Sequence, residues 1–193
     1  STEGVSSAAS DVYKRQRWGY ACSKAMDEFL GLAYHREMGL PVVIFRLFNT
    51  VGPRQTGHYG MVLPTFVKQA IGGEPITVYG DGEQLRCFTY VRDVVQAMVD
   101  ILEVEEAAGE VFNVGSNREI SINDLASLVK TTLVSDSSIE HIPYERVYAP
   151  GFEDMRRRLP DYSILQSYIN YEPNTDLTGI IREIADAFME EKQ

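Results

Sequence analysis

The sequence predicts an α/β protein, and two observations carry the prediction. Segments with apolar residues at helical spacing alternate along the chain with short runs rich in β-branched and aromatic residues. One of these runs, Val42-Val43-Ile44-Phe45, is apolar throughout, which is typical of a strand covered on both faces. A helical pattern comes shortly before it, and a helix that leads into a buried strand is half of an α/β unit.

Several of the predicted elements have recognisable ends. The first helix is expected to end at Gly39, because glycine readily adopts the left-handed conformation that closes a helix. A helix from Ile122 is expected to be capped by Ser121 and Asp124, which resemble a capping box. After an irregular segment over 1–16, the predicted elements are a helix over 23–38, a strand over 42–45, a helix over 64–71, strands over 76–79 and 86–91, a helix over 93–104, a strand over 111–114, a helix from 122, a strand over 139–142, and helices over 162–168 and 177–189.

The composition excludes several classes of protein. Of the 193 residues 28 are acidic and 18 basic, so the formal net charge is −10, whereas a nucleic-acid binder needs a net basic field to displace counterions. No apolar run approaches the ~18 residues of a membrane span, and the first residues lack the apolar core of a signal peptide. Cys22 and Cys87 stand alone, which argues against a disulfide scaffold or a metal site. We therefore expect a cytoplasmic protein that binds no nucleic acid, membrane or metal.

Tyr20 and Lys24 stand four residues apart, which puts both side chains on one face of the first helix. An ammonium group beside a phenol favours the phenolate and lowers a pKa that is otherwise about 10. Such a tyrosine can act as a general acid or base near neutral pH. The same spacing also fits an ordinary surface pair, so other motifs must support a catalytic interpretation.

Asn49 and the turn Gly52-Pro53 come directly after the predicted buried strand at 42–45. In open α/β sheets, ligands bind beyond the carboxyl ends of the strands, which makes Asn49 a candidate ligand contact. The alternative is a turn in which the asparagine satisfies its own backbone. These residues alone leave both interpretations open.

Six motifs then occur in one fixed order. They are Tyr20-x-x-x-Lys24, Arg46-x-x-Asn49 with Gly52-Pro53, Val78-Tyr79-Gly80-Asp81-Gly82, Arg86 before an aromatic strand ending in Val91-Arg92-Asp93-Val94, Phe112-Asn113-Val114-Gly115, and Arg158-Leu159-Pro160-Asp161. With these motifs, residues 17–190 resemble the carboxy-terminal part of the nucleotide-sugar epimerase/dehydratase family of extended short-chain dehydrogenases/reductases.

The resemblance implies an α/β fold that combines the carboxy-terminal portion of a Rossmann-like doubly wound sheet with a smaller α/β substrate-binding domain. Residues 17–60 would be the tail of the NAD-binding domain. Residues 61–193 would mainly bind the nucleotide sugar, with 93–116 returning to the Rossmann-like domain. The segment 1–16 matches nothing in the family and looks foreign.

The resemblance also implies roles for individual residues. Tyr20 would be the catalytic acid/base, and Lys24 would bind the nicotinamide ribose of NAD and depress the pKa of Tyr20. Leu47 and Phe48 would lie against the nicotinamide. The implied contacts to the sugar nucleotide are Asn49 at the diphosphate, Val62, Leu63, Thr77 and Tyr79 at the base and ribose, Arg86 and Arg158 clamping the diphosphate, and Asp161 near the nucleoside ribose. Arg156 and Arg157 fit an ordinary solvated charge run.

The activity that we expect from the resemblance is NAD-dependent epimerisation at C4 of a UDP-sugar, as in a UDP-glucose 4-epimerase, by a homodimeric enzyme. The alternatives are a UDP-glucuronate decarboxylase, a dTDP-glucose 4,6-dehydratase-like enzyme, or a sugar-nucleotide-binding fragment without turnover.

The sequence departs from the family in one large respect. It contains no strand–GxxGxxG–helix segment of the kind that binds the pyrophosphate of NAD. We therefore expect a truncated gene product that is inactive alone and binds little NAD. Smaller departures are Arg92 and Cys87, which stand where the family often has acidic residues.

Overall fold

The computed structural model describes residues 16–55, 61–147 and 154–190, and the chain forms two compact units. The first unit contains the described residues up to Ile44 together with Glu105–Val111. The second contains Phe45–Val104 and the described residues from Phe112 onward. The predicted irregular segment over 1–16 lies outside the described residues, apart from Gln16, at which a helix begins.

The first unit is built on the long helix α2 (Gln16–Met38), which starts earlier than the predicted residue 23. The helix ends as predicted, because Gly39 adopts a φ of 67° and its amide donates to the carbonyl of His35 over 3.0 Å. Beyond this turn the chain runs back along α2. A Cβ on Gly31 would lie 3.3 Å from Cγ1 of Val42, so this glycine allows the close approach. The short helix η1 (Glu105–Ala107) belongs to the same unit.

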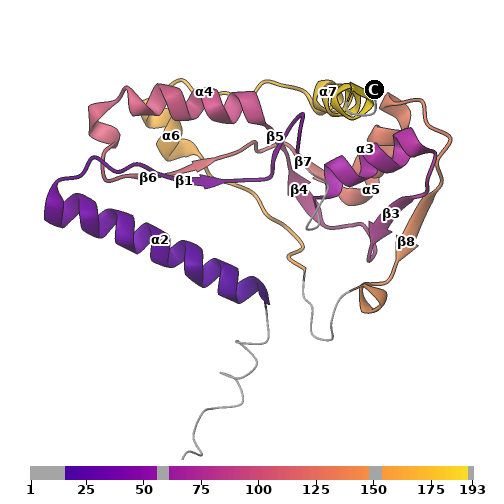
Figure 1. Ribbon diagram of the computed structural model, residues 1–193, viewed down its shortest axis with the longest axis horizontal. Helices are drawn as coiled ribbons and strands as arrows, with labels where there is room; N and C mark the ends of the chain where they lie inside the picture. Colours follow the sequence, from indigo (N-terminus) through magenta and orange to yellow (C-terminus); the bar gives the residue numbers. More distant parts are fainter. Residues whose placement is uncertain (1–15, 56–60, 148–153, 191–193) are drawn as a thin grey trace, which may run out of the picture. The chain divides into compact units, whose positions relative to one another are not determined.

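The core of the second unit is a helical layer packed on a strand pair. The helices α3 (Val62–Gly72), α5 (Ile122–Thr132) and α7 (Leu177–Glu190) pack on one another, and β3 (Ile76–Tyr79) pairs in parallel with β8 (Ile139–Ile142) beside them (Figure 1). Side chains from all three helices and from β3 are fully buried in this core, namely Leu63, Phe66, Val67, Ile76, Val78, Leu125, Val129, Ile181 and Ile184. Burial of this apolar surface is the main stabilising contribution to the unit.

Three further strand pairs complete the fold. The strand β1 (Ile44–Leu47) pairs with β6 (Val111–Val114). The strand β2 (Thr50–Val51) runs parallel to β5 (Thr89–Tyr90), and β4 (Leu85–Cys87) runs antiparallel to β7 (Glu119–Ser121). The other helices within the described residues are α4 (Val91–Leu102), η2 (Tyr144–Arg146) and α6 (Ser163–Tyr168). The α/β class with parallel strand pairs is therefore confirmed.

The structure shifts two predicted strands because pairing partners, rather than apolar runs, set their limits. The apolar run at 42–45 predicts a strand two residues too early, since β1 begins at Ile44, whose amide donates to the carbonyl of Glu110 over 3.1 Å. The single strand predicted over 86–91 is two strands. Its first part pairs with β7 and its second part pairs with β2, and Phe88 separates them. The short strands β2 and β7 carry no apolar run that would predict them.

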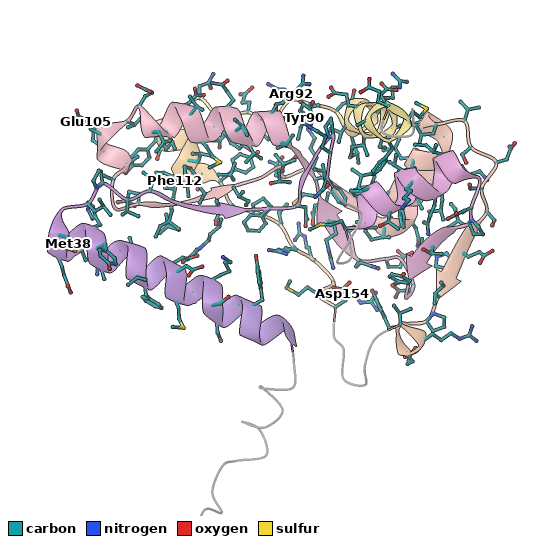
Figure 2. All side chains as sticks on the ribbon, in the orientation of Figure 1. Met38, Tyr90, Arg92, Glu105, Phe112 and Asp154 are labelled. Carbon is teal, nitrogen blue, oxygen red and sulfur yellow. The ribbon has the colours of Figure 1, made fainter. Side chains whose placement is uncertain are left out.

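The start of α4 is fastened to α7 by a small polar cluster (Figure 2). The Tyr90 hydroxyl donates to Glu183 on α7, and Arg92 pairs with the same carboxylate over 3.6 Å. Arg92 also lies over the Tyr90 ring, 5.5 Å from its centroid. The basic residue at position 92 therefore has a local structural role.

Candidate functional site

Tyr20 and Lys24 lie one turn apart on α2, as their spacing predicts. The Nζ atom of Lys24 is 5.9 Å from the centroid of the Tyr20 ring and 3.0 Å from Oδ2 of Asp27. The hydrogen bond and charge of Asp27 are the main causes that raise the pKa of Lys24, so its ammonium form is favoured. Both side chains are exposed. This arrangement can move a proton at the phenol and bind hydroxyl groups at the ammonium, while the catalytic role of Tyr20 stays a prediction.

Asn49 stands at the sharp corner between β1 and β2. Its φ is 35°, a left-handed conformation that asparagine tolerates better than most residues. Its Nδ2 donates to the carbonyl of Cys87 over 2.7 Å, and its own carbonyl accepts from the amide of Thr89 over 3.2 Å. The side-chain amide therefore bonds to β4 rather than to its own backbone. The contact with a diphosphate that the resemblance implies stays a prediction.

Phe48 and Arg158 form a cationic platform just beyond β1. The guanidinium carbon of Arg158 lies 5.3 Å from the centroid of the Phe48 ring, within the range of a cation–π interaction. Next to Phe48, a Cβ on Gly115 would lie 2.8 Å both from Cβ of Phe48 and from Cγ of Pro160. Only glycine fits there without displacing one of them. The resulting surface presents an exposed positive charge on an aromatic support, which suits an anionic ligand.

Asp161 follows this platform and lies just before the short helix α6. Its Oδ1 accepts from the amide of Ser163 over 2.9 Å, and this hydrogen bond is the main cause that lowers the pKa of the carboxyl. Its carbonyl accepts from Nδ2 of Asn113 over 2.8 Å. Asp161 is thus an ionised, well-oriented carboxylate near Arg158 in the chain, and its predicted contact with a ribose stays a prediction.

The guanidinium group of Arg86 forms hydrogen bonds with neighbouring residues of the protein. Its NH1 donates to the carbonyls of Leu85 and Met155 over 2.7 and 2.8 Å, and its NH2 donates to Oδ1 of Asp154 over 2.8 Å. The two charged side chains are only 14% and 17% exposed. Arg86 and Arg158 therefore have different surroundings, and the diphosphate clamp implied for the pair stays a prediction.

The predicted base-and-ribose residues are spread over two elements. Val62 and Leu63 begin α3, as expected, but the Leu63 side chain is completely buried in the core, so only its backbone could contact a nucleotide. Thr77 is held by Gln69, whose Nε2 donates to Oγ1 over 2.8 Å and whose Oε1 accepts from the Thr77 amide over 3.1 Å. Tyr79 ends β3 and is half-buried. Their nucleotide contacts remain predictions.

A polar pocket beside β4 combines Asp81, which belongs to one of the motifs, with four residues that lie outside them. It has a volume of about 160 Å³ and is lined by Asp81, Gln84, Tyr144, Asp154 and Arg156. Figure 2 marks Asp154 at the point where the described chain resumes. The Tyr144 hydroxyl donates to Oδ2 of Asp154 over 3.1 Å, and burial followed by the Asp154 charge raises the pKa of Tyr144 to about 12.

One sequence signal could have led to this pocket. Gly80 and Gly82 flank Asp81, and both have a φ of 73°. A Cβ on Gly80 would lie 2.3 Å from the Tyr144 ring, so the turn needs glycine there. No such signal exists for Asp154, because a single carboxylate in an irregular segment has no periodic pattern around it.

The described ranges 16–55, 61–147 and 154–190 lack two features. They contain no helix with the length and hydropathy needed to cross a bilayer. They also contain no group of three or more His, Cys, Asp or Glu side chains placed to hold a metal ion.

The chain is similar to known proteins of one enzyme family. The model of the NAD dependent epimerase/dehydratase family matches residues 2–115. Two curated relatives are a UDP-N-acetyl-alpha-D-glucosaminuronate decarboxylase of Bacillus cytotoxicus, 41% identical over 90% of this chain and 54% of the relative, and the UDP-glucuronic acid decarboxylase 1 of Arabidopsis thaliana, 37% identical over 89% of this chain and 38% of the relative.

The solved structures include a UDP-glucose 4-epimerase of Thermotoga maritima with UDP-glucose. It is 30% identical, has a TM-score of 0.80, and is matched over 90% of this chain and 54% of its own. The chain thus spans about half the length of that epimerase and of the Bacillus relative, and less of the Arabidopsis protein.

Proposed function

Because the chain belongs to the NAD dependent epimerase/dehydratase family, we propose that the protein containing it decarboxylates a UDP-linked sugar acid. The family and the Rossmann-like fold expected from the motifs are confirmed. The specific expectation of a UDP-glucose 4-epimerase is not supported by the curated relatives. The observation that carries the decarboxylase proposal is the 41% identity to a UDP-N-acetyl-alpha-D-glucosaminuronate decarboxylase over 90% of this chain.

Lys24 and Leu47 each carry a side chain of the kind that the nicotinamide end of NAD would need. Lys24 offers an exposed ammonium group for the ribose hydroxyls, and Leu47 offers an exposed apolar side chain beside Phe48 for the face of the nicotinamide ring. Bound NAD supplies a reversible hydride acceptor, and the protein supplies orientation and proton transfer. The sequence contains no glycine-rich phosphate loop for the pyrophosphate. The assignment of 17–60 and 93–116 to the cofactor domain, and of the rest of 61–193 to the sugar-nucleotide domain, is likewise a proposal.

The chemistry that we propose begins at Tyr20. Its phenolate takes the proton of the C4 hydroxyl as that carbon is oxidised to a ketone. The C5 carboxylate then belongs to a β-keto acid, which loses CO₂ and leaves an enolate that takes a proton at C5. Reduction of the ketone restores the C4 hydroxyl with a proton from Tyr20, so the overall reaction is redox-neutral. Arg158 holds the diphosphate throughout, because a guanidinium group suits phosphate oxygens.

The proposal includes a homodimer formed through α2. Its exposed side chains include Met26, Phe29 and Leu30, which are 59% to 73% exposed. Large apolar side chains gathered on one helix are typical of an interface. Sedimentation velocity of the full-length protein tests this proposal. We expect a dimer, and a monomer at all concentrations would contradict it.

The reaction is tested with the full-length protein that contains this sequence and added NAD. UDP-glucuronate, UDP-N-acetylglucosaminuronate and UDP-glucose are supplied separately, and products are identified by NMR spectroscopy. We expect a decarboxylated UDP-sugar from one or both acids and no conversion of UDP-glucose. Formation of UDP-galactose without decarboxylation would restore the epimerase interpretation. Binding without any turnover would favour a non-catalytic sugar-nucleotide-binding protein.

A further inference from the structure

The three consecutive arginines at 156–158 have different partners. Arg156 pairs with Asp81, with NH1 2.6 Å from Oδ2. Arg157 makes a two-pronged pair with Glu119 on β7, with Nε 2.7 Å from Oε1 and NH2 2.7 Å from Oε2. Among the residues that the structure describes, Arg158 pairs with no carboxylate and lies over the Phe48 ring instead. Two of the arginines are therefore paired with carboxylates, and the third has no carboxylate partner among the described residues and can bind an anionic ligand.

The backbone of the same segment is tied to β4. The Leu85 amide donates to the carbonyl of Arg156 over 2.8 Å, and Leu85 forms a parallel bridge with Arg157. One residue further along β4, Arg86 binds Asp154 and the carbonyl of Met155. These bonds fix the segment's register along the strand.

Cys87, the last residue of β4, forms a hydrogen bond with the backbone of Arg158 in the Phe48–Arg158 platform. The Cys87 thiol donates to the carbonyl of Arg158 over 3.6 Å, an ordinary length for a bond to sulfur. Burial raises the pKa of the Cys87 thiol, which keeps it protonated and able to donate. A carboxylate at position 87, as is common in the family, could not donate a hydrogen bond when ionised. The neutral thiol therefore suits a contact with a carbonyl oxygen.

We propose that Arg157 is a positioning residue for substrate binding, and that its fork onto Glu119 holds the segment so that Arg158 presents its guanidinium group to the diphosphate of the sugar nucleotide. The proposal rests on the proposed function and identifies what aims its anion-binding arginine. A planar guanidinium matches a carboxylate at two points at once, which fixes direction as well as distance. Since β7 pairs with β4, the fork connects the arginine segment to the same pair of strands that holds its backbone.

The test measures binding of UDP to the full-length protein by isothermal titration calorimetry at one ionic strength. The variants are Arg157→Gln, Arg157→Lys, the exchange Arg157→Glu with Glu119→Arg, and Arg158→Gln. Arg118→Gln is the matched control, because it removes the same charge beside Glu119 in the sequence and from an exposed residue. Circular dichroism of each variant verifies that it is folded.

We expect Arg157→Gln to weaken UDP binding about two- to fivefold, in the range of an exposed ion pair, with kcat changed less than KM wherever turnover is measured. Arg157→Lys should weaken UDP binding as well, since a lysine ammonium cannot make the two parallel hydrogen bonds of a guanidinium group to a carboxylate. The exchange of Arg157 and Glu119 should restore part of the affinity. Arg158→Gln should have the largest effect, and Arg118→Gln little.

The outcomes separate this proposal from the proposed function. Wild-type protein that does not bind UDP would contradict both. Tight UDP binding that is equal in wild type and in Arg157→Gln would overturn only the positioning role of Arg157. The same conclusion would follow if Arg118→Gln lost as much UDP affinity as Arg157→Gln. If Arg157→Gln does not fold, the UDP affinities of Arg157→Lys and of the exchange variant test the proposal instead. A folded exchange variant that binds UDP no more tightly than Arg157→Lys would also overturn the positioning role of Arg157.

Discussion

Replacement of Gly115 by alanine tests the packing behind the Phe48–Arg158 platform. A Cβ at this position would lie 2.8 Å from Cβ of Phe48 and from Cγ of Pro160, whereas ordinary contact begins at 3.4 Å. Each neighbour must therefore retreat by roughly 0.6 Å, the difference between these two distances. Gly115 is buried, and its carbonyl already accepts from the Tyr171 hydroxyl over 3.1 Å, so the strand has little freedom to move instead.

We expect Gly115→Ala to lower the free energy of unfolding by about 1–3 kcal/mol, which is the usual cost of overpacking a core. The displacement of Phe48 also moves the support of Arg158. Misplacement of a binding group by a fraction of an ångström should raise KM for the sugar nucleotide on the order of tenfold. Urea unfolding and steady-state kinetics of the full-length protein measure the two effects.

Gly179→Ala is the matched control, since nothing lies within 4 Å of its Cβ position and it stands in α7. It should stabilise the protein by about 0.5–1 kcal/mol through helix propensity and leave KM unchanged. Equal stability and equal KM for Gly115→Ala and wild type would refute the packing argument. A large loss of stability with no change in KM would separate Arg158 from the packing behind it.

The remaining predictions concern other parts of the chain. Tyr20→Phe should lower kcat about 10²–10⁴-fold in steady-state assays and leave UDP affinity nearly unchanged, because only the proton-transfer group is lost; an unchanged kcat would contradict its role. Burial raises the pKa of Tyr144 from its ordinary value of 10.0 to about 12 in the folded protein, so the stability that it contributes is complete below pH 10 and is lost as the pH rises toward 12. Tyr144→Phe should therefore flatten part of the alkaline decline in urea unfolding, and an identical decline would count against it. Ser121→Ala should cost about 1 kcal/mol in the same measurement, because the Ser121 side chain accepts from the Asp124 amide at the start of α5; Ser127→Ala, inside that helix, should cost less.

Local patterns predicted much of the fold. The cap at Ser121, the helix end at Gly39 and the strands at 111–114 and 139–142 all depend on neighbours in sequence, and the structure confirms them. The limits of β1 and the division between β4 and β5 depend on strands far away in the chain. No periodicity within the segment 86–91 shows that its two halves pair with different partners.

In the candidate site, too, some features depend on neighbours in the sequence and others on residues far away in the chain. The spacing of Tyr20 and Lys24 places them on one helical face, and the structure confirms this proximity. By contrast, the partner of Arg157 lies 38 residues away on β7, so Glu119 could not be found by spacing. The motif distinguishes Arg158 in the sequence, whereas Arg156 and Arg157 fit a solvated charge run there, and only the tertiary contacts show that these two have carboxylate partners.

The central claim is that the protein removes CO₂ from a UDP-linked sugar acid. The most direct measurement follows UDP-glucuronate and UDP-N-acetylglucosaminuronate, each labelled with ¹³C in the carboxyl group, by NMR spectroscopy with the full-length protein and catalytic amounts of NAD. We predict that the label of at least one substrate appears in CO₂ and bicarbonate in a one-to-one ratio with a decarboxylated UDP-sugar. Quantitative retention of the label in both sugar nucleotides, in a protein that binds them, would contradict the account.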